Sequence, residues 1–186
     1  AGRVAVDCAD LAADYVSLSA HKIGGPQGVG ALIVRGRAPF AAGRLGGGQE
    51  SGRRAGTENV PGIVGMGVAA SLARTMDSHH RDALAQAAKA LGATIVAEGA
   101  PRLPNTVLAI FPFPGDLIVA ALDLEGFQTS TGSACHSGAS KAGEVLQAMG
   151  IVDLPVRFSI GPGIDPGPVV PVLERVLARL EGACGS

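Results

Sequence analysis

The feature that most constrains the fold is the segment at residues 17–30, where a glycine-rich connection holding one lysine joins two apolar runs. The runs at 15–18 and 30–34 are short and bounded by turn residues, which predicts two strands. Lys22 would then follow a strand end among small residues, where a flat cofactor can approach closely. Desolvation there would free its amine for Schiff-base chemistry, whereas the alternative is a solvated lysine in a glycine turn.

Polar groups beside this lysine favour an anion. Ser19 and His21 could each hydrogen-bond a phosphate, and the glycines let the backbone come near it. A second dense segment, residues 46–59, holds five glycines, two arginines and Thr57 shortly before a helical pattern. Glycine permits the positive φ of a backbone anion nest, and a helix N-terminus favours phosphate. The segment is therefore either a phosphate contact or a capped loop.

One cysteine and one arginine further along are candidates for chemistry. Cys135 lies among glycine, serine and alanine, unlike an inert cysteine in an apolar core, and from such a loop it could attack a substrate. Arg157 stands in an apolar run that predicts a strand, so its guanidinium would need a carboxylate, from a substrate or from a structural ion pair. With Cys8 and Cys184, the cysteines lack the paired spacing of a disulfide framework or a zinc site.

The rest of the chain alternates helical and extended patterns, which predicts an α/β or α+β arrangement. A polar break at 76–80 follows the helix after Thr57, and we place a domain boundary there. His79 and His80 in this break are adjacent, so we expect solvated side chains and no metal site. The other expected elements are strands at 3–6, 105–111, 127–130 and 156–161, and helices around 84–91, 116–124, 141–149 and 167–181.

Composition limits the class of protein. A net charge of −1 gives no argument for nucleic-acid binding, and 47% hydrophobic residues over 186 positions suffice for a sizeable core. Glycines and charges interrupt every apolar run before it could span a bilayer, so we expect a soluble, cytoplasmic enzyme without membrane contact. The chain opens at Ala1, almost inside an apolar run, and we expect a piece of a longer protein.

Four motifs, in this order, resemble those of the cysteine desulfurases of the class V aminotransferase family. They are Ser19-Ala20-His21-Lys22 with Gly25-Pro26, the segment 46–57 with its Arg54-Ala55-Gly56-Thr57 ending, Gly132-Ser133-Ala134-Cys135, and Arg157-Phe158-Ser159-Ile160-Gly161. The links at 102–106 and 148–150 match as well, so the resemblance spans essentially all of the chain. It implies a partial α/β fold of PLP-dependent transferase fold type I, with residues 1–76 ending the large PLP-binding domain and residues 77–186 forming most of the small C-terminal domain.

The resemblance also implies a cofactor, pyridoxal 5′-phosphate (PLP), and an assembly. Lys22 would hold PLP covalently and move the α-proton of the substrate. Ser19 and His21 would bind the PLP phosphate. Thr57 would contact the phosphate of the neighbouring subunit's cofactor, which makes a homodimer the expected unit.

The implied reaction removes sulfur from L-cysteine and leaves L-alanine. Cys135 would take the sulfur as a persulfide, and Arg157 would hold the substrate carboxylate. The glycine and serine content of 131–138 resembles the branch of the family that passes sulfur to iron–sulfur scaffold proteins or other acceptors.

Two departures and two alternatives accompany this interpretation. The family has an aspartate upstream of the lysine that pairs with the pyridine nitrogen, and Asp7 does not align with it, so we carry no role over. Roughly the first half of a family member is absent, and we expect this chain to be inactive by itself.

A selenocysteine lyase or another class V enzyme is one alternative; Cys135→Ala should abolish sulfur release but leave a selenocysteine activity partly intact. The other is a non-catalytic fragment that dimerises or binds a partner.

Overall fold

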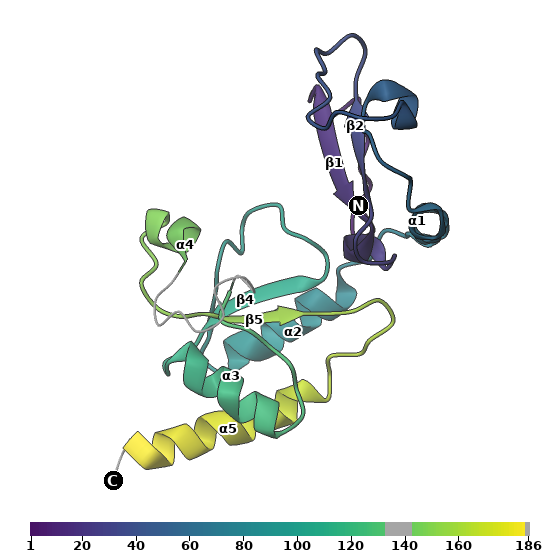
Figure 1. The fold of residues 1–186 in the computed structure, drawn as a ribbon. Coiled ribbons are helices and arrows are strands. Elements are labelled where there is room, and N and C mark those ends of the chain that lie inside the picture. Colours follow the sequence, from purple (N-terminus) through teal and green to yellow (C-terminus); the bar gives the residue numbers. More distant parts are fainter. Residues whose placement is uncertain (133–142, 185–186) are drawn as a thin grey trace. The chain divides into compact units, whose positions relative to one another are not determined.

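The computed structural model of the chain describes residues 1–132 and 143–184 and divides into two compact units, Ala1–Thr75 and Met76–Ser186 (Figure 1). We call them unit 1 and unit 2 and describe each by itself. Among the described residues, no helix combines the length and the apolar character needed to cross a membrane.

Unit 1 contains an antiparallel hairpin that holds the lysine segment between its strands. Strand β1, Tyr15–Ser19, pairs with β2, Gly30–Val34, with Tyr15 opposite Val34. Both strands confirm the prediction made from the apolar runs. The strand predicted at 3–6 is wrong, because no neighbouring strand of the described chain takes up its backbone hydrogen bonds.

Helix α1, Val60–Leu72, carries no charged side chain and packs against the turn that follows the lysine. Two glycines allow this close approach. A Cβ added at Gly25 would lie 3.2 Å from the Cβ of Ala69, and one added at Gly65 would lie 3.1 Å from Cγ of Pro26. Small residues on both sides therefore set the distance between the helix and the turn.

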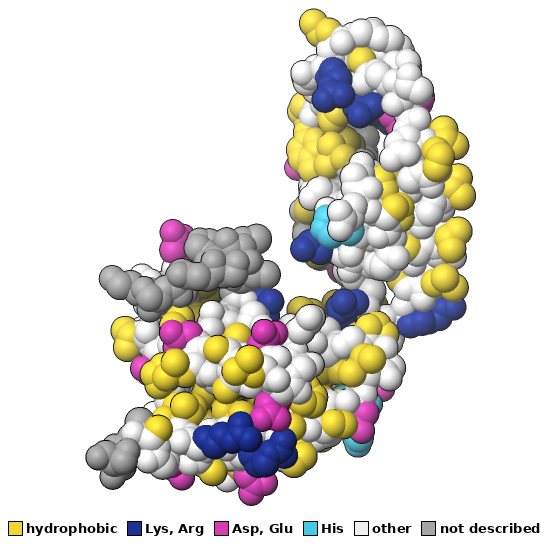
Figure 2. Space-filling model, turned by 60° about the horizontal axis from the view of Figure 1, so that its bottom comes forward, with side chains coloured by type: hydrophobic (Ala, Val, Ile, Leu, Met, Phe, Trp, Pro, Cys, Tyr) yellow, Lys and Arg dark blue, Asp and Glu magenta, His cyan; other side chains and the backbone are white. Residues whose placement is uncertain are grey.

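Unit 1 has few fully buried hydrophobic side chains. Its buried hydrophobic residues are Ala20 and Ala55, and all 75 of its residues are described. Large hydrophobic side chains of α1 are instead exposed: Val60, Ile63, Val64, Val68 and Leu72. Figure 2 shows hydrophobic side chains on the surface of the chain in many places. The core that the composition predicts is thus not shared evenly between the two units.

Unit 2 is an antiparallel sheet in the order β3-β4-β5 with helices packed on it (Figure 1). Its strands are β3 Thr94–Ile95, β4 Thr106–Ile110 and β5 Val156–Ser159. Its helices are α2 His79–Ala90, α3 Gly115–Leu124, α4 Glu144–Ala148 and α5 Val169–Cys184. This arrangement is of the α+β type.

The two faces of this sheet have different surroundings. One face packs against α2, α3 and α5 in the main core, whose fully buried residues include Val107, Val156 and Leu173. On the other face Leu108 belongs to a smaller cluster around Leu146 of α4. Because side chains alternate along a strand, Arg157 lies on this second face, opposite Leu108 in the register.

Three predicted boundaries in unit 2 need correction. The strand predicted at 127–130 is reduced to one bridge, in which Ser130 pairs with Arg157. Helix α2 begins at His79, so the two histidines start the helix and do not lie in the break before it; the carboxylate of Asp77 accepts a hydrogen bond from the His79 N–H at 3.0 Å. Of the helix predicted at 141–149, residues 144–148 are helical, and residues 141–142 lie outside the described residues.

Glu125, the residue that follows α3, makes a pH-dependent contact with α5. Its carboxylate accepts hydrogen bonds from Arg175 at 3.2 Å and Arg179 at 3.0 Å. The bond from Arg179 is the main reason why the pKa of Glu125 lies below its ordinary value of 4.5. A carboxyl with a lowered folded pKa stabilises the fold above its unfolded pKa, and this contribution is lost as the pH falls through the folded pKa.

We therefore expect Glu125→Gln to lower the urea midpoint slightly at pH 7 and to flatten its decrease as the pH falls below the ordinary carboxyl pKa of 4.5. Glu174→Gln, an exposed change on α5, is the matched control and should leave that decrease unchanged. Equal acid sensitivity in wild type and Glu125→Gln would mean that the two arginines do not stabilise the fold through this carboxylate.

Candidate functional site

The lysine turn lies directly after β1, in the single-turn 3₁₀ helix Ala20–Ile23. Ala20 is fully buried; its carbonyl accepts the N–H of Gly24 and of Gly25, and its N–H donates to Val29. Gly24 has a φ of +86°, the left-handed conformation that glycine adopts at low cost. A buried alanine and two glycines therefore fix the turn.

The three side chains next to the buried Ala20 are exposed to solvent. Ser19, His21 and Lys22 are all exposed, and no hydrogen bond or ion pair to a described residue engages their side chains. The expected desolvation of Lys22 is therefore not supplied by the described part of this chain. What the turn offers is a free amine next to a hydroxyl and an imidazole, the groups that can meet a carbonyl and an anion.

The glycine segment before α1 has a strained backbone. Glu50 and Ser51 have φ values of +50° and +56°, a region that costs a non-glycine residue on the order of 1–3 kcal/mol. The Gln49 side chain accepts the Gly56 N–H at 3.1 Å, which ties the two ends of the segment together. Thr57, just beyond this tie, is exposed. Strained backbone of this kind is frequent at ligand sites, so the segment stays a candidate phosphate contact.

Thr57 is not the residue that caps α1. Asn59 does so, its side-chain oxygen accepting the Gly62 N–H at 3.2 Å, two residues after Thr57. The sequence contains the signal, an asparagine two residues before Pro61 in the first helical turn. The hydroxyl of Thr57 is therefore not used in capping.

Arg157 is held by backbone pairing on both sides. Leu108 lies opposite it on β4, and on the other side its N–H donates to the Ser130 carbonyl at 2.6 Å while its carbonyl accepts from Ser130 at 3.2 Å. Its Nε is buried and has no hydrogen-bond partner among the described atoms. Every aspartate and glutamate of the chain is among the described residues, and none forms an ion pair with Arg157. The structural ion pair considered for this residue is thus not found.

Cys135 is the remaining candidate. Cys135 lies in residues 133–142, between the paired Ser130 and helix α4, outside the described residues. Ser19, His21 and Lys22 share one turn of unit 1, and Arg157 belongs to unit 2. Within the described ranges no group of three or more histidine, cysteine, aspartate or glutamate side chains could hold a metal ion.

Comparison with known proteins identifies relatives of this chain. The aminotransferase class-V model matches residues 1–163. A cysteine desulfurase of Cereibacter sphaeroides is 44% identical over 155 residues, which are 80% of this chain and 40% of the relative. A NifS-like protein from Rickettsia africae is 28% identical with a TM-score of 0.78, over 95% of this chain and 51% of that one. The structure described as SspA in complex with cysteine is 30% identical with a TM-score of 0.66, over 84% and 46%.

These matches also define how much of the fold is present. The chain spans about half the length of the curated relatives it matches, from 40% to 50% for those most similar to it. Its α/β fold is accordingly that of about half of a NifS-like protein. With the family model matching 163 of its 186 residues, the chain belongs to the aminotransferase class-V family.

Proposed function

We propose that this chain carries the lysine, arginine and cysteine of a PLP-dependent cysteine desulfurase, which converts L-cysteine to L-alanine and a protein-bound persulfide. The observation that carries the proposal is the state of Arg157. Its Nε is buried without a hydrogen-bond partner among the described residues, and none of the aspartates and glutamates, all of which are described, pairs with it. A guanidinium in this state favours a carboxylate from a ligand, and cysteine, which carries one, is named both in the cysteine desulfurase relative and in the SspA complex.

The lysine turn fits PLP by its donor set. PLP carries an aldehyde and a phosphate, and the turn presents an unengaged amine beside a hydroxyl and an imidazole. Lys22 Nζ would bind the cofactor covalently and would later move the α-proton of the substrate. Ser19 Oγ and the His21 ring would bind the phosphate. When bound, PLP supplies an electron sink for charge that develops at the substrate's α-carbon.

The sulfur-transfer step is assigned to Cys135. Its thiolate would attack the sulfur of the bound cysteine, so that an S–S bond forms and the C–S bond breaks. The electron pair of the broken bond stays with the substrate carbon, which takes a proton and leaves as alanine. The enzyme keeps the sulfur as a persulfide, which it passes to an acceptor such as an iron–sulfur scaffold protein.

The proposal extends to the assembly. Thr57, exposed beyond the strained segment, would contact the phosphate bound by a second copy, which makes a homodimer the proposed unit. Unit 1 would be part of the large PLP-binding domain and unit 2 most of the small domain. We place the protein in the cytoplasm, where its persulfide would meet a reducing environment.

The carboxylate role of Arg157 is tested by ligand pairs that differ only in that group. In the chain loaded with PLP, Arg157→Gln should weaken L-alanine binding by about 1.5–3 kcal/mol, roughly 10- to 150-fold, because a charge-assisted hydrogen bond is lost. Binding of L-alaninamide, which has no carboxylate, should stay unchanged. Calorimetric titration measures both constants.

Arg175→Gln is the matched control, since Arg175 is an exposed arginine already bound to Glu125. It should leave both constants as in the wild type. If Arg157→Gln still prefers L-alanine to L-alaninamide as the wild type does, Arg157 is not the carboxylate site.

A further inference from the structure

Asn105 is the one buried polar residue in the described part of the chain, with 6% of its surface exposed. Its side-chain Nδ2 donates to the Ile160 carbonyl at 2.9 Å, and its backbone carbonyl accepts the Ile160 N–H at 2.9 Å. Both bonds join positions 55 residues apart, next to the paired residues of β4 and β5. Asn105 thus closes the ladder between these strands at one end.

The register between β4 and β5 decides which face Arg157 occupies. Along β5 the residues alternate: Val156 and Phe158 are buried in the main core, and Arg157 and Ser159 lie on the other face. A slip of one residue against β4 would move the guanidinium to the core side and Phe158 out of it. The strand is only four residues long, and the buried Pro155 before it has no N–H to donate, so its position depends on the bonds to β4, to Ser130 and to Asn105.

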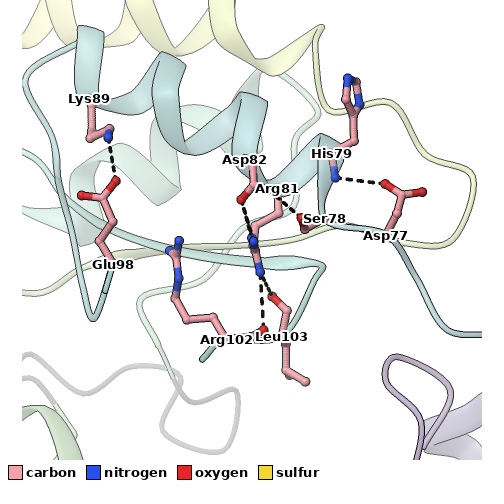
Figure 3. Close-up of polar contacts among 9 residues, drawn as sticks. All are labelled: Asp77, Ser78, His79, Arg81, Asp82, Lys89, Glu98, Arg102 and Leu103. Atoms are coloured by element: carbon pink, nitrogen blue, oxygen red, sulfur yellow. Dashed lines mark hydrogen bonds and ion pairs between the residues drawn. The ribbon is translucent and has the colours of Figure 1, made fainter. Parts of the chain in front are cut away.

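The segment before Asn105 is itself held in place from helix α2. Figure 3 shows Arg81 reaching from this helix to the backbone ahead of β4, where it donates to the carbonyls of Leu103 at 3.1 Å and Arg102 at 3.4 Å. Asp82 accepts two bonds from the same guanidinium, at 2.6 and 2.8 Å. The backbone just before Asn105 is therefore held by Arg81, and Asn105 in turn bonds to Ile160 at the end of β5.

We propose that Asn105 is a positioning residue for Arg157: its buried amide holds the end of β5 in register, so that the guanidinium is presented beside Leu108 on the second face of the sheet. The inference rests on the proposed function for the role of Arg157. It assigns Asn105 no contact with substrate. Because a buried polar group can serve to select one arrangement of a fold, its removal should loosen the alignment as well as lower stability.

The test compares Asn105→Ala with Val107→Ala, which truncates a fully buried residue of β4 two positions further along the chain and removes neither bond to Ile160. Urea unfolding first establishes how far each change lowers stability. Titration of the PLP-loaded chain then gives the preference for L-alanine over L-alaninamide. Hydrogen exchange of the Arg157 and Ser130 amides, which bond to each other's carbonyls, reports the alignment without any ligand.

We expect Asn105→Ala to reduce the preference for L-alanine over L-alaninamide about tenfold. It should also speed hydrogen exchange at the Arg157 and Ser130 amides by more than the measured loss of stability accounts for. Val107→Ala should change stability but not the preference. If both variants lower the preference equally at equal stability, or if Asn105→Ala leaves preference and exchange unchanged, Asn105 is only structural and the inference is wrong. A wild-type chain without preference, or one that Arg157→Gln does not alter, refutes the proposed function, while the exchange rates still decide whether Asn105 aligns β5.

Discussion

Replacing Lys22 with arginine should reduce covalent labelling of the chain by PLP to background. The wild type, mixed with PLP and treated with borohydride, should gain the mass of the reduced cofactor on the peptide that contains Lys22. Arginine keeps the positive charge at this exposed turn but stays protonated, so it cannot attack an aldehyde. The change therefore separates the chemistry of the amine from the electrostatics of the site.

The chain is well suited to this measurement because it has three lysines, Lys22, Lys89 and Lys141. Lys89→Arg is the control, since the Lys89 ammonium is engaged by Glu98 at 2.6 Å and should not be labelled (Figure 3). Peptide mass spectrometry assigns the label to one of the three. Labelling spread evenly over the lysines, or retained in Lys22→Arg, would contradict the assignment of this turn to PLP.

Alanine at two helical glycines should change stability in opposite directions. At Gly115, the first residue of α3, an added Cβ would collide with the backbone carbonyl of Leu154, which cannot move aside as a side chain can. We expect Gly115→Ala to cost about 1–3 kcal/mol, as overpacking in a core does. For a unit of this size, 1 kcal/mol corresponds to a fall in Tm of about 4–8 °C.

Gly182 is the matched control. It lies in the last turn of α5, and an added Cβ would meet nothing within 4 Å. Gly182→Ala should stabilise the chain by up to about 1 kcal/mol, because alanine favours the helix over glycine. Urea unfolding of both variants measures the difference. A Gly115→Ala chain within 0.5 kcal/mol of the wild type, on the order of an ordinary surface change, would show that α3 can shift away from Leu154.

Sequence patterns predict a helix or strand well where interactions between residues close in sequence determine it. The hairpin β1–β2 follows from two apolar runs around a glycine turn, and α5 from its regular apolar positions. The strands predicted at 3–6 and 127–130 are not formed as such, because a strand needs a neighbour and the sequence does not say which segments lie side by side. The signals for the start of α2 are Asp77, whose carboxylate accepts the His79 N–H, and Ser78 at the N-cap position; both residue types are common at helix starts, but here they lie within a longer polar run.

The candidate site divides in the same way. The residue types and their order indicate the family, and a short turn brings Ser19, His21 and Lys22 together because they are neighbours in sequence. The missing partner of Arg157 could not be predicted, since it depends on which strands flank β5. Nor could the exposure of Lys22, because desolvation depends on what packs over a turn and not on the turn itself.

The unequal cores of the two units have a calorimetric consequence. The heat-capacity change of unfolding follows the apolar surface that becomes hydrated, and unit 1 buries only two alanines among its hydrophobic residues. The larger part of the change is then expected from Met76–Ser186, roughly 1.5 kcal/mol/K at the usual 12–15 cal/mol/K per residue. We therefore expect unit 2 to set most of the curvature of the chain's stability with temperature, which scanning calorimetry measures as the heat-capacity change.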